Sequence, residues 1–367
     1  MNVGVDGSAL GKQRTGVGRY ISTLLETLII GHPDSTFFVY SNGPIELEIH
    51  KNVHLRISKL HGRGPVWQNI QLPLLIKRDR LDVYWGGNGL LPAIGLHQIA
   101  TVLTIHDLVY YFAGETTPWI SRLGRRLFQP LSSKKANKIV ADSQATAQDV
   151  ELIYDRKVDA ILYPVVSSRF RLSDPLEIER VGLKLKLDIP YILTLGTMEP
   201  RKNLPSLIDA YILCRQRGVH LPRLVIAGKK GWLDNELTRR IQKAEEHGVI
   251  QTLGYVDDED LPGLYGGAEA FIFPSRYEGF GMPLLEAQLC GTPVLYGNHP
   301  AMREAAGGVG VEFEPTVDGI ANILSRFAAG TCNLTCRVPS FITNSAVDGA
   351  SILWHLLVAA AEENLHK

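Results

Sequence analysis

One segment of the chain combines carboxylates, glycines and a helix start at a spacing suited to binding a phosphorylated polyol. Glu278 precedes Gly279 and Gly281, and Glu286 lies eight positions after Glu278. Glycines let backbone N–H groups approach a ligand, and the positive end of a helix dipole favours an anion. The carboxylates could accept hydrogen bonds from ribose and from another polyol, so we predict a sugar-nucleotide site. The alternative is a structural crossover whose glycines only turn the chain, but such a turn needs no flanking carboxylates.

A second candidate site combines two adjacent cations with another helix start. Arg201 and Lys202 follow the strand-like run YILTLGT and come just before a helical pattern that begins at Leu204. Two cations and a helix N-terminus facing one place predict an anion site. An Arg-Lys pair before a helix is also common on protein surfaces, which is the alternative interpretation.

The residues around the first site predict a strand, a loop, a helix and a second strand. The run from Phe271 to Phe273 is β-compatible, and Pro283 suits the first position of a helix. Gly291 suits the residue beyond the last helical turn, and Pro293 to Leu295 resumes a strand. The loop then falls where open α/β sheets bind ligands, at the carboxyl end of a strand.

The same alternation recurs along the whole chain and predicts two α/β domains. Strand-like runs alternate with helical stretches at VGVDGSAL, STFFVYSN, LDVYWGG, IATVLTIHD, NKIVADS, YILTLGT, RLVIAG, VIQTLGYV, EAFIFPS and TPVLYG. Such alternation predicts parallel sheets covered by helices on both faces. A length of 367 residues favours two domains over one core. We expect an N-terminal domain over 1–170, a linker near 166–187, a second domain over 171–345 and a last helix over about 346–367.

Composition and charge narrow the classes of protein. The hydrophobic fraction is 45% and the mean hydropathy is +0.01, with no run of membrane-spanning length and no secretory signal pattern, so we expect a protein that stays inside the cell. Cys214, Cys290, Cys332 and Cys336 are too scattered for a disulfide framework and are expected as free thiols. The net charge of zero gives no reason to expect nucleic-acid binding.

The charge is nevertheless uneven, and one stretch is strongly basic. Residues 1–170 carry nineteen Lys and Arg against fourteen Asp and Glu, and no acid lies between Glu115 and Asp142. Within 119–138, apolar residues interleave with the basic ones at roughly helical spacing. A helix lying on an anionic membrane would show this pattern, and so would an ordinary solvated amphipathic helix. The sequence favours neither interpretation.

The segments EGFGMPLLE and GTMEPRKNL together resemble the motifs of the retaining glycosyltransferases of family 4. The resemblance implies the GT-B fold, in which two Rossmann-like, doubly wound domains face each other across a cleft. The first domain would bind the acceptor and the second the nucleotide-sugar donor, and the C-terminal helix would pack back on the first domain. The resemblance implies that Glu278 contacts the donor sugar and that Glu286 holds the ribose. It also implies that Arg201 and Lys202 hold the diphosphate and stabilise the departing nucleotide.

The resemblance also assigns residues in the first domain. His106 and Asp107 match the family's active-site His-Asp, and the glycines of TGVGRY match a loop beside the donor phosphates. That loop lies too far from Val3 to Val5 for a dinucleotide fingerprint, which disfavours a dehydrogenase. Apart from the resemblance, we expect Ser143 and Arg19 on the acceptor side, with helix capping as an equal alternative for Ser143. The residues assigned to donor binding are Gly16, Gly18, Gly196, Gly254, Tyr255, Val256, Gly279, Phe280, Gly281, Met282, Pro283, Leu284 and Glu286.

The implied reaction is transfer of a hexose from a nucleotide diphosphate to an acceptor hydroxyl with retention of configuration. Metal-dependent glycosyltransferases usually hold a divalent ion on an Asp-x-Asp pair, but Arg201 and Lys202 can take the ion's place, so we expect neither metal nor cofactor. The motifs VDGxxL, TGVGRY, HDL, GTMEPRKNL and GKKGW most resemble bacterial mannosyltransferases that use GDP-mannose to build surface polysaccharides. Rhamnose, glucose and N-acetylglucosamine donors remain alternatives. So do a non-hydrolysing sugar-nucleotide epimerase and a silent sugar-nucleotide-binding subunit.

Overall fold

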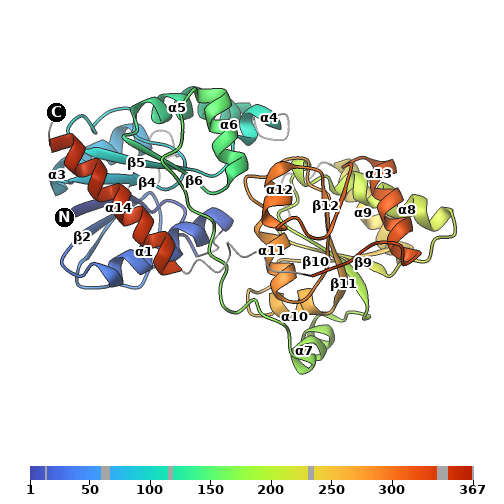
Figure 1. The fold of residues 1–367 in the computed structure, drawn as a ribbon. Coiled ribbons are helices and arrows are strands. Elements are labelled where there is room, and N and C mark those ends of the chain that lie inside the picture. Colours follow the sequence, from blue (N-terminus) through green and yellow to red (C-terminus); the bar gives the residue numbers. More distant parts are fainter. Residues whose placement is uncertain (13–14, 59–66, 115–118, 230–234, 337–345, 366–367) are drawn as a thin grey trace. The chain divides into compact units, whose positions relative to one another are not determined.

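The computed structural model describes the whole chain except residues 13–14, 59–66, 115–118, 230–234, 337–345 and 366–367 (Figure 1). The chain divides into two compact units, each with its own parallel sheet. The first comprises Met1–Tyr111, Pro118–Val165 and Phe341–Lys367, and the second Phe112–Thr117 and Val166–Ser340. The unit boundary therefore falls at Val165, slightly before the boundary predicted at residue 170.

The first unit is built on a seven-stranded parallel sheet in the order β3-β2-β1-β4-β5-β6-β7. Its central strands are apolar and buried on both faces, as parallel sheets require; every residue of β5 is buried. The strands are β1 (Asn2–Asp6), β2 (Thr36–Ser41), β3 (Val53–Ile57), β4 (Val83–Gly86), β5 (Ala100–Ile105), β6 (Lys138–Ala141) and β7 (Ala160–Ile161).

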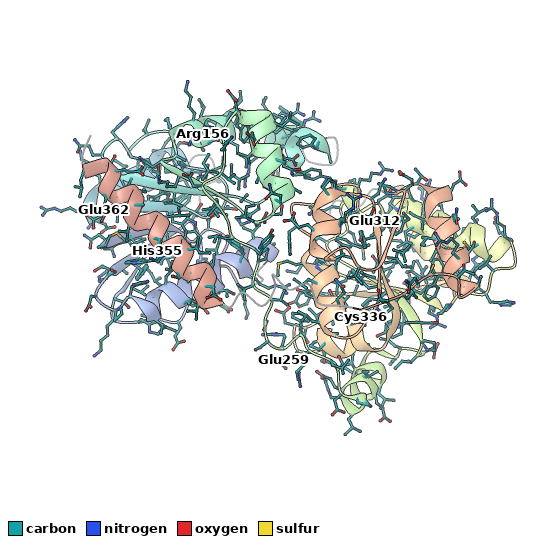
Figure 2. The ribbon with its side chains drawn as sticks, in the orientation of Figure 1. Arg156, Glu259, Glu312, Cys336, His355 and Glu362 are labelled. Atoms are coloured by element: carbon teal, nitrogen blue, oxygen red, sulfur yellow. The ribbon has the colours of Figure 1, made fainter. Side chains whose placement is uncertain are left out.

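Helices follow the strands of this sheet and supply its two hydrophobic cores. They are α1 (Gly16–Gly31), the π-helix η1 (Trp67–Gln71), α3 (Leu72–Asp79), α4 (Val109–Phe112), α5 (Trp119–Lys135), α6 (Gln144–Tyr154) and α14 (Ala346–Leu365). Arg156, which follows α6 and is labelled in Figure 2, donates hydrogen bonds to the carbonyl oxygens of Ser133 and Ala136 at 2.9 and 3.2 Å. These bonds satisfy carbonyls at the end of α5 that have no partner within the helix.

The C-terminal helix α14 packs against α1, β4 and β5 of the first unit (Figure 1). Its buried residues Ala350, Leu353, Leu357 and Ala360 join the core formed by α1 and the sheet. The ring of Trp354 stacks on His32 at the end of α1, with ring centroids 3.6 Å apart. A segment from the end of the chain therefore completes the core of the unit with which the chain begins.

The second unit carries a six-stranded parallel sheet in the order β10-β9-β8-β11-β12-β13. Its strands are β8 (Tyr191–Leu195), β9 (Arg223–Ala227), β10 (Ile250–Gly254), β11 (Ala268–Phe273), β12 (Val294–Gly297) and β13 (Val311–Phe313). The order places β8 beside β11, with Phe271 paired to Leu193, although these strands are far apart in sequence. The loops after β8 and β11 therefore leave the same edge of the sheet side by side.

Eight helical segments of the described residues surround this sheet. They are α7 (Pro175–Leu185), the 3-10 helix η3 (Pro200–Lys202), α8 (Leu204–Gln216), α9 (Asn235–Glu246), α10 (Leu261–Gly266), α11 (Met282–Leu289), α12 (Pro300–Ala305) and α13 (Val317–Ala328). The four cysteines are free thiols. None of the described helices has the length and apolar content that crossing a bilayer requires.

Candidate active site

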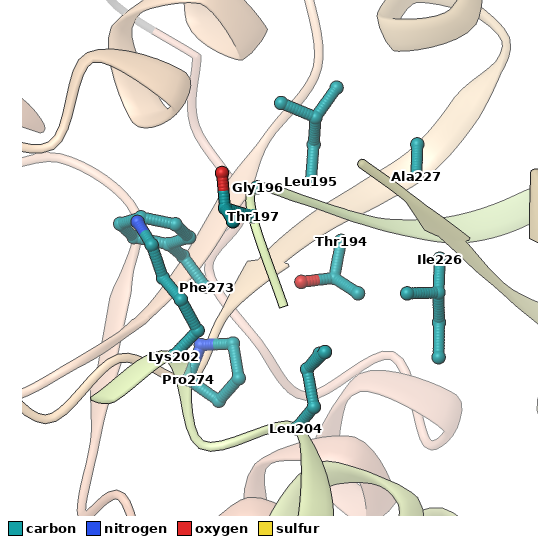
Figure 3. Close-up of a pocket in the computed structure, with 10 residues that line it drawn as sticks. All are labelled: Thr194, Leu195, Gly196, Thr197, Lys202, Leu204, Ile226, Ala227, Phe273 and Pro274. Carbon is teal, nitrogen blue, oxygen red and sulfur yellow. The ribbon is translucent and has the colours of Figure 1, made fainter. Parts of the chain in front are cut away.

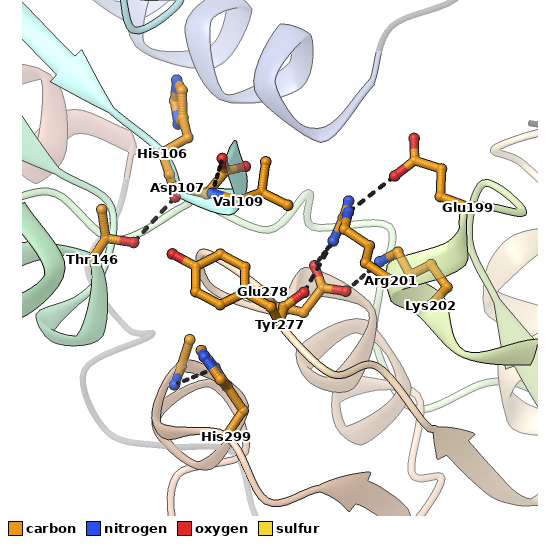
Figure 4. A network of polar contacts seen from close by, with 11 residues as sticks. His106, Asp107, Val109, Thr146, Glu199, Arg201, Lys202, Tyr277, Glu278 and His299 are labelled. Carbon is orange, nitrogen blue, oxygen red and sulfur yellow. Dashed lines mark hydrogen bonds and ion pairs between the residues drawn. The ribbon is translucent and has the colours of Figure 1, made fainter. Parts of the chain in front are cut away.

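Arg201 and Lys202, which follow β8, both donate hydrogen bonds to the carboxylate of Glu278, which follows β11 (Figure 4). The Arg201 Nη1 donates to Oε2 of Glu278 at 2.6 Å, and the Lys202 Nζ donates to Oε1 at 2.6 Å. Arg201 is also held from its other side, where its Nε donates to Glu199 Oε2 at 2.9 Å. The two anion-binding motifs of the sequence thus form one cluster at one edge of the second sheet.

Local structure holds these side chains in place. Arg201 and Lys202 lie in η3, which ends at Asn203 in the left-handed conformation with φ at 57°. The buried Asn203 amide donates to the carbonyls of Pro274 and Pro315 at 3.2 and 2.8 Å, which ties the loop after β8 to the loop after β11. Because asparagine tolerates positive φ and offers two donors, it suits this junction.

The cluster has strongly perturbed proton affinities. Burial alone would raise the pKa of Glu278, but the charges of Arg201 and Lys202 outweigh it and lower that pKa to about 2. Burial, assisted by repulsion from Arg201, lowers the pKa of Lys202 although Glu278 opposes this. Glu278 and the partly exposed Glu199 together balance the two cations, so an anion that took the place of Glu278 could pair with both Arg201 and Lys202.

The second glutamate of the motif lies inside α11, and a buried tyrosine holds it. Gly281 has φ at 112° and caps the start of the helix, with Pro283 in the first turn. The Tyr265 hydroxyl donates to Glu286 Oε2 at 2.8 Å, and both side chains are buried. This contact fixes the orientation of the carboxylate. The helix was predicted over Pro283 to Cys290, and α11 spans Met282–Leu289, one residue earlier at each end.

Three glycines bring backbone groups close together at the ends of β8, β9 and β10. Gly196, Gly228 and Gly254 all have positive φ. The backbones of Gly196 and Gly228 are in such close contact that a Cβ added to Gly228 would lie 2.0 Å from the Gly196 oxygen. A small pocket beside Gly196 is lined by Thr194, Lys202, Phe273 and other residues of the strand ends (Figure 3). Only glycine permits this approach of the strands.

Several predicted donor-binding residues could offer a ligand only their backbone. The side chains of Val256, Phe280 and Leu284 are buried in the second unit, whereas Gly279, Met282 and Pro283 are partly exposed. Tyr255 is exposed, and the Lys229 ammonium lies 5.0 Å from the centroid of its ring. Lys230 to Trp232 of the GKKGW motif lie outside the described residues.

In the first unit, His106 follows β5 and uses both ring nitrogens within the unit. Its Nε2 lies 2.7 Å from the Gly87 oxygen, and its Nδ1 lies 3.2 Å from Asp142 Oδ2. The Thr146 hydroxyl donates to the His106 carbonyl at 3.1 Å (Figure 4). Asp107 accepts a hydrogen bond from the Val109 N–H at 3.2 Å, so its carboxylate caps α4.

The remaining predicted residues of the first unit lie at helix starts. Ser143 caps α6 by accepting from the Thr146 N–H at 2.9 Å, which is the capping alternative that the sequence left open. The loop expected over the glycines of TGVGRY is instead the first turn of α1, because Thr15 caps the helix at Gly16 and accepts from the Gly18 N–H at 3.4 Å. Arg19 lies partly buried in that turn.

The chain contains one Asp-x-Asp triplet, Asp258 to Asp260, of the kind that holds a divalent ion in metal-dependent glycosyltransferases. The Asp260 side chain is buried, and its oxygens accept from Arg180 at 2.9 Å and Lys184 at 2.5 Å. The Arg180 and Lys184 charges therefore already neutralise Asp260. The described residues contain no group of three or more His, Cys, Asp or Glu side chains arranged to hold a metal.

Three contacts of these sites were not predicted from the sequence: Tyr265 with Glu286, Asn203 with the two proline carbonyls, and Asp142 with His106. Asn203 stands inside the motif GTMEPRKNL and Asp142 at the end of the strand-like run NKIVADS, and both could have been singled out on that ground. Tyr265 lies in the preceding helix α10 and carries no such signal.

Comparison with known proteins identifies the class. Two parallel-sheet, Rossmann-like units with these strand-end clusters define a GT-B glycosyltransferase. The model of the family described as glycosyl transferases group 1 matches residues 177–327, and the model described as glycosyltransferase family 4 matches residues 14–165. The O-antigen chain mannosyltransferase B of Escherichia coli is 32% identical over 332 residues, which cover 84% of this chain and 85% of that protein. The chain belongs to the family 4 glycosyltransferases.

Other comparisons agree. A serotype-specific mannosyltransferase, WbdA of Escherichia coli, is 35% identical over 203 residues, which cover 53% of this chain and 24% of that protein. The solved structure of WaaG, a glycosyltransferase involved in lipopolysaccharide biosynthesis, has a TM-score of 0.70 at 17% identity and covers 99% of this chain and 98% of its own. Anabaena HepE in complex with UDP and glucose has a TM-score of 0.68 at 17% identity, covering 100% and 98%.

Proposed function

We propose that this glycosyltransferase moves a mannosyl residue from GDP-mannose to a hydroxyl of a saccharide or lipid-linked saccharide during surface polysaccharide synthesis. The relatives named above support the choice of sugar, because two of them are mannosyltransferases and one of these builds an O-antigen chain. The observation that carries the proposal is the Glu278 carboxylate between Arg201 and Lys202, at the strand ends where α/β sheets bind ligands.

The cluster suits a reaction whose main difficulty is charge on a departing diphosphate. In the proposed step the bond between the anomeric carbon and the phosphate oxygen breaks, and its electron pair leaves with the nucleoside diphosphate. The acceptor oxygen bonds to the same face of the anomeric carbon, and its proton passes to the leaving phosphate oxygen, so configuration is retained. Arg201 and Lys202 would stabilise the developing negative charge, which is usually the largest single contribution to catalysis.

Glu278 would have two roles in this scheme. Without donor, it neutralises two cations that would otherwise repel each other in a largely buried place. With donor bound, the diphosphate would take over that neutralisation and release the carboxylate toward the sugar hydroxyls. Arg201 and Lys202 would then provide the positive charge that a divalent ion provides elsewhere, so we propose that transfer needs no metal.

Helix α11 would hold the nucleoside part of the donor. Glu286 is held by Tyr265, and its carboxylate retains capacity for ribose hydroxyls because a carboxylate has about four acceptor positions. The backbone at Gly254 and Tyr255 would contact the base. Recognition of the base through backbone groups fits a family whose members use donors with different nucleobases. The identity of the base in this protein is therefore a question for experiment.

We also propose that α5 places the enzyme on an anionic membrane surface. Four apolar side chains follow each other at every fourth position of this helix and are half or more exposed: Trp119 at 67%, Leu123 at 51%, Leu127 at 56% and Leu131 at 50%. Such spacing forms one continuous stripe, and Lys134 and Lys135 are exposed at the end of the helix. An apolar stripe with basic neighbours is the pattern of a helix that lies in a lipid interface. A solvated surface helix is the alternative.

A thermal-shift panel of nucleotide sugars tests the proposed donor. The expected result is stabilisation by GDP-mannose and by GDP, with a smaller response to UDP-glucose, UDP-N-acetylglucosamine and dTDP-rhamnose. Stabilisation by a different nucleotide sugar would identify that sugar as the donor in place of mannose and would leave the glycosyltransferase assignment unchanged. Donor consumption without any acceptor would favour the epimerase, and binding without turnover would favour the silent binding subunit.

A further inference from the structure

The His106 imidazole connects three neighbouring strand ends of the first unit. His106 follows β5, Gly87 follows β4 and Asp142 follows β6, and these strands are adjacent in the sheet. The ring lies 2.7 Å from the Gly87 oxygen through Nε2 and 3.2 Å from Asp142 Oδ2 through Nδ1. His106 and Asp142 are about nine-tenths buried, so water competes little for these contacts.

The chemistry of the two partners fixes the protons on the ring. A carbonyl oxygen only accepts hydrogen bonds, so Nε2 must carry a proton. While Asp142 is ionised it too only accepts, so Nδ1 then carries a second proton and the ring is an imidazolium. The charge of His106 opposes the burial that raises the pKa of Asp142. The other oxygen of Asp142 has no hydrogen-bond partner among the described residues, so the charge of this buried carboxylate depends on His106.

The surroundings support the charged form. Burial opposes charge on His106, but the hydrogen bond and attraction of Asp142, followed by the Gly87 carbonyl and Asp107, outweigh it and raise the pKa of His106. Tyr20 of α1 packs edge to face against the ring at a centroid distance of 5.0 Å, and burial raises the pKa of its hydroxyl, so Tyr20 adds no charge.

We propose that Asp142 is a positioning residue for glycosyl transfer, which holds His106 as an imidazolium at the carboxyl edge of the first sheet. This inference rests on the proposed function. Both ring nitrogens are bound within the unit, so His106 would contribute its fixed positive charge rather than a hydrogen bond to a sugar. A fixed charge at a strand-end edge acts on negative charge that develops in a reaction without needing to reorganise.

The variant Asp142→Asn tests this with little change of shape. Its amide can turn to donate to Nδ1, which suits a neutral ring that still donates from Nε2 to Gly87. The hydrogen-bond network is then preserved, and the opposite charges of Asp142 and His106 are lost together. Asp79→Asn is the matched control, because Asp79 is likewise a buried carboxylate of the first unit paired to a cation, Arg56, at 2.7 Å.

Two measurements decide the proposal. In histidine-labelled protein at pH 7.5, nitrogen NMR should show both ring nitrogens of His106 protonated in the wild type and one in Asp142→Asn, with the signals assigned by their loss in His106→Gln. An unprotonated nitrogen of His106 in the wild type would overturn the proposal. This result is read from the wild type, and only the assignment needs a folded His106→Gln protein.

The second measurement is the pH dependence of transfer from GDP-mannose to a mannose oligosaccharide. Loss of a charge at this distance shifts a pKa by about 1–3. The ratio of kcat at pH 8 to kcat at pH 6 should therefore be about tenfold or more lower in Asp142→Asn than in the wild type. In Asp79→Asn this ratio should equal that of the wild type. An unchanged ratio in a folded Asp142→Asn protein would overturn the proposal. A wild type that transfers from no nucleotide sugar would instead overturn the proposed function, while the NMR result still tests the charge on His106.

Discussion

Replacing Glu278 by Gln should destabilise the second unit and at the same time strengthen its binding of diphosphate. The substitution keeps the shape of the side chain but removes the charge that Arg201 and Lys202 share at 2.6 Å each. Two cations then remain close together in a largely buried place. Removing one partner of a buried ion pair is costly for this reason.

The size of the effect follows from the proton affinity of Glu278. Its pKa is lowered from 4.5 to about 2, and at 1.36 kcal/mol for each tenfold change this corresponds to about 3 kcal/mol of stabilisation of the charged form. Because the folded-state pKa is depressed, this stability is fully present above pH 4.5 and is lost as the pH falls from 4.5 toward 2. The difference between wild type and Glu278→Gln should therefore be about 3 kcal/mol at pH 7 and shrink through that range.

Urea unfolding followed by circular dichroism measures this difference, with hydrogen exchange of β8 and β11 to report on the second unit by itself. The control is Glu312→Gln, which removes a more exposed carboxylate paired to Arg303 in the same unit and should cost less than about 1 kcal/mol. Pyrophosphate should raise the Tm of Glu278→Gln more than that of the wild type. Equal stability at pH 7, or an equal response to pyrophosphate, would refute the reasoning.

Three further predictions concern other parts of the molecule. Tyr265→Phe removes the hydrogen bond to Glu286 and should weaken GDP-mannose binding about tenfold or more in calorimetry, because a hydrogen bond to a charged group contributes about 1.5 kcal/mol or somewhat more; unchanged affinity would show that Glu286 does not take part in donor binding. Transfer should continue undiminished in excess EDTA, and a loss restored by Mg²⁺ or Mn²⁺ would contradict the metal-free mechanism. The double variant Leu123→Glu, Leu127→Glu should lose flotation with anionic vesicles but keep transfer to a soluble acceptor, whereas Leu152→Glu, at a still more exposed position of α6, should keep both.

Much of the fold could be predicted because the central strands of each sheet are continuous apolar runs. The strands that were missed, β3, β7 and β13, lie at the edges of their sheets or are very short. In β3 only Val53 is buried, so its sequence lacks the apolar run that marks a central strand. Its structure comes from pairing with β2, which the sequence does not display.

The start of α1 shows how capping can override propensity. Gly16 and Gly18 are poor helix formers and suggested a loop, yet Thr15 begins the helix before them. The motifs identified Arg201, Lys202 and Glu278 as site residues. They did not predict that the carboxylate of Glu278 lies between the two cations. That contact depends on β8 and β11 being neighbours, which is a property of the sheet order.

The proposed role of Lys202 is tested by measuring transfer from GDP-mannose to a mannose oligosaccharide by the wild type and by Lys202→Ala. Lys202 lies 2.6 Å from Glu278, and the account requires its charge to stabilise the departing diphosphate. The wild type should release GDP and form an α-mannoside, and Lys202→Ala should lose at least about a hundredfold in kcat, while Lys243→Ala, an exposed lysine of α9, should not. Normal turnover by a folded Lys202→Ala protein would contradict the account.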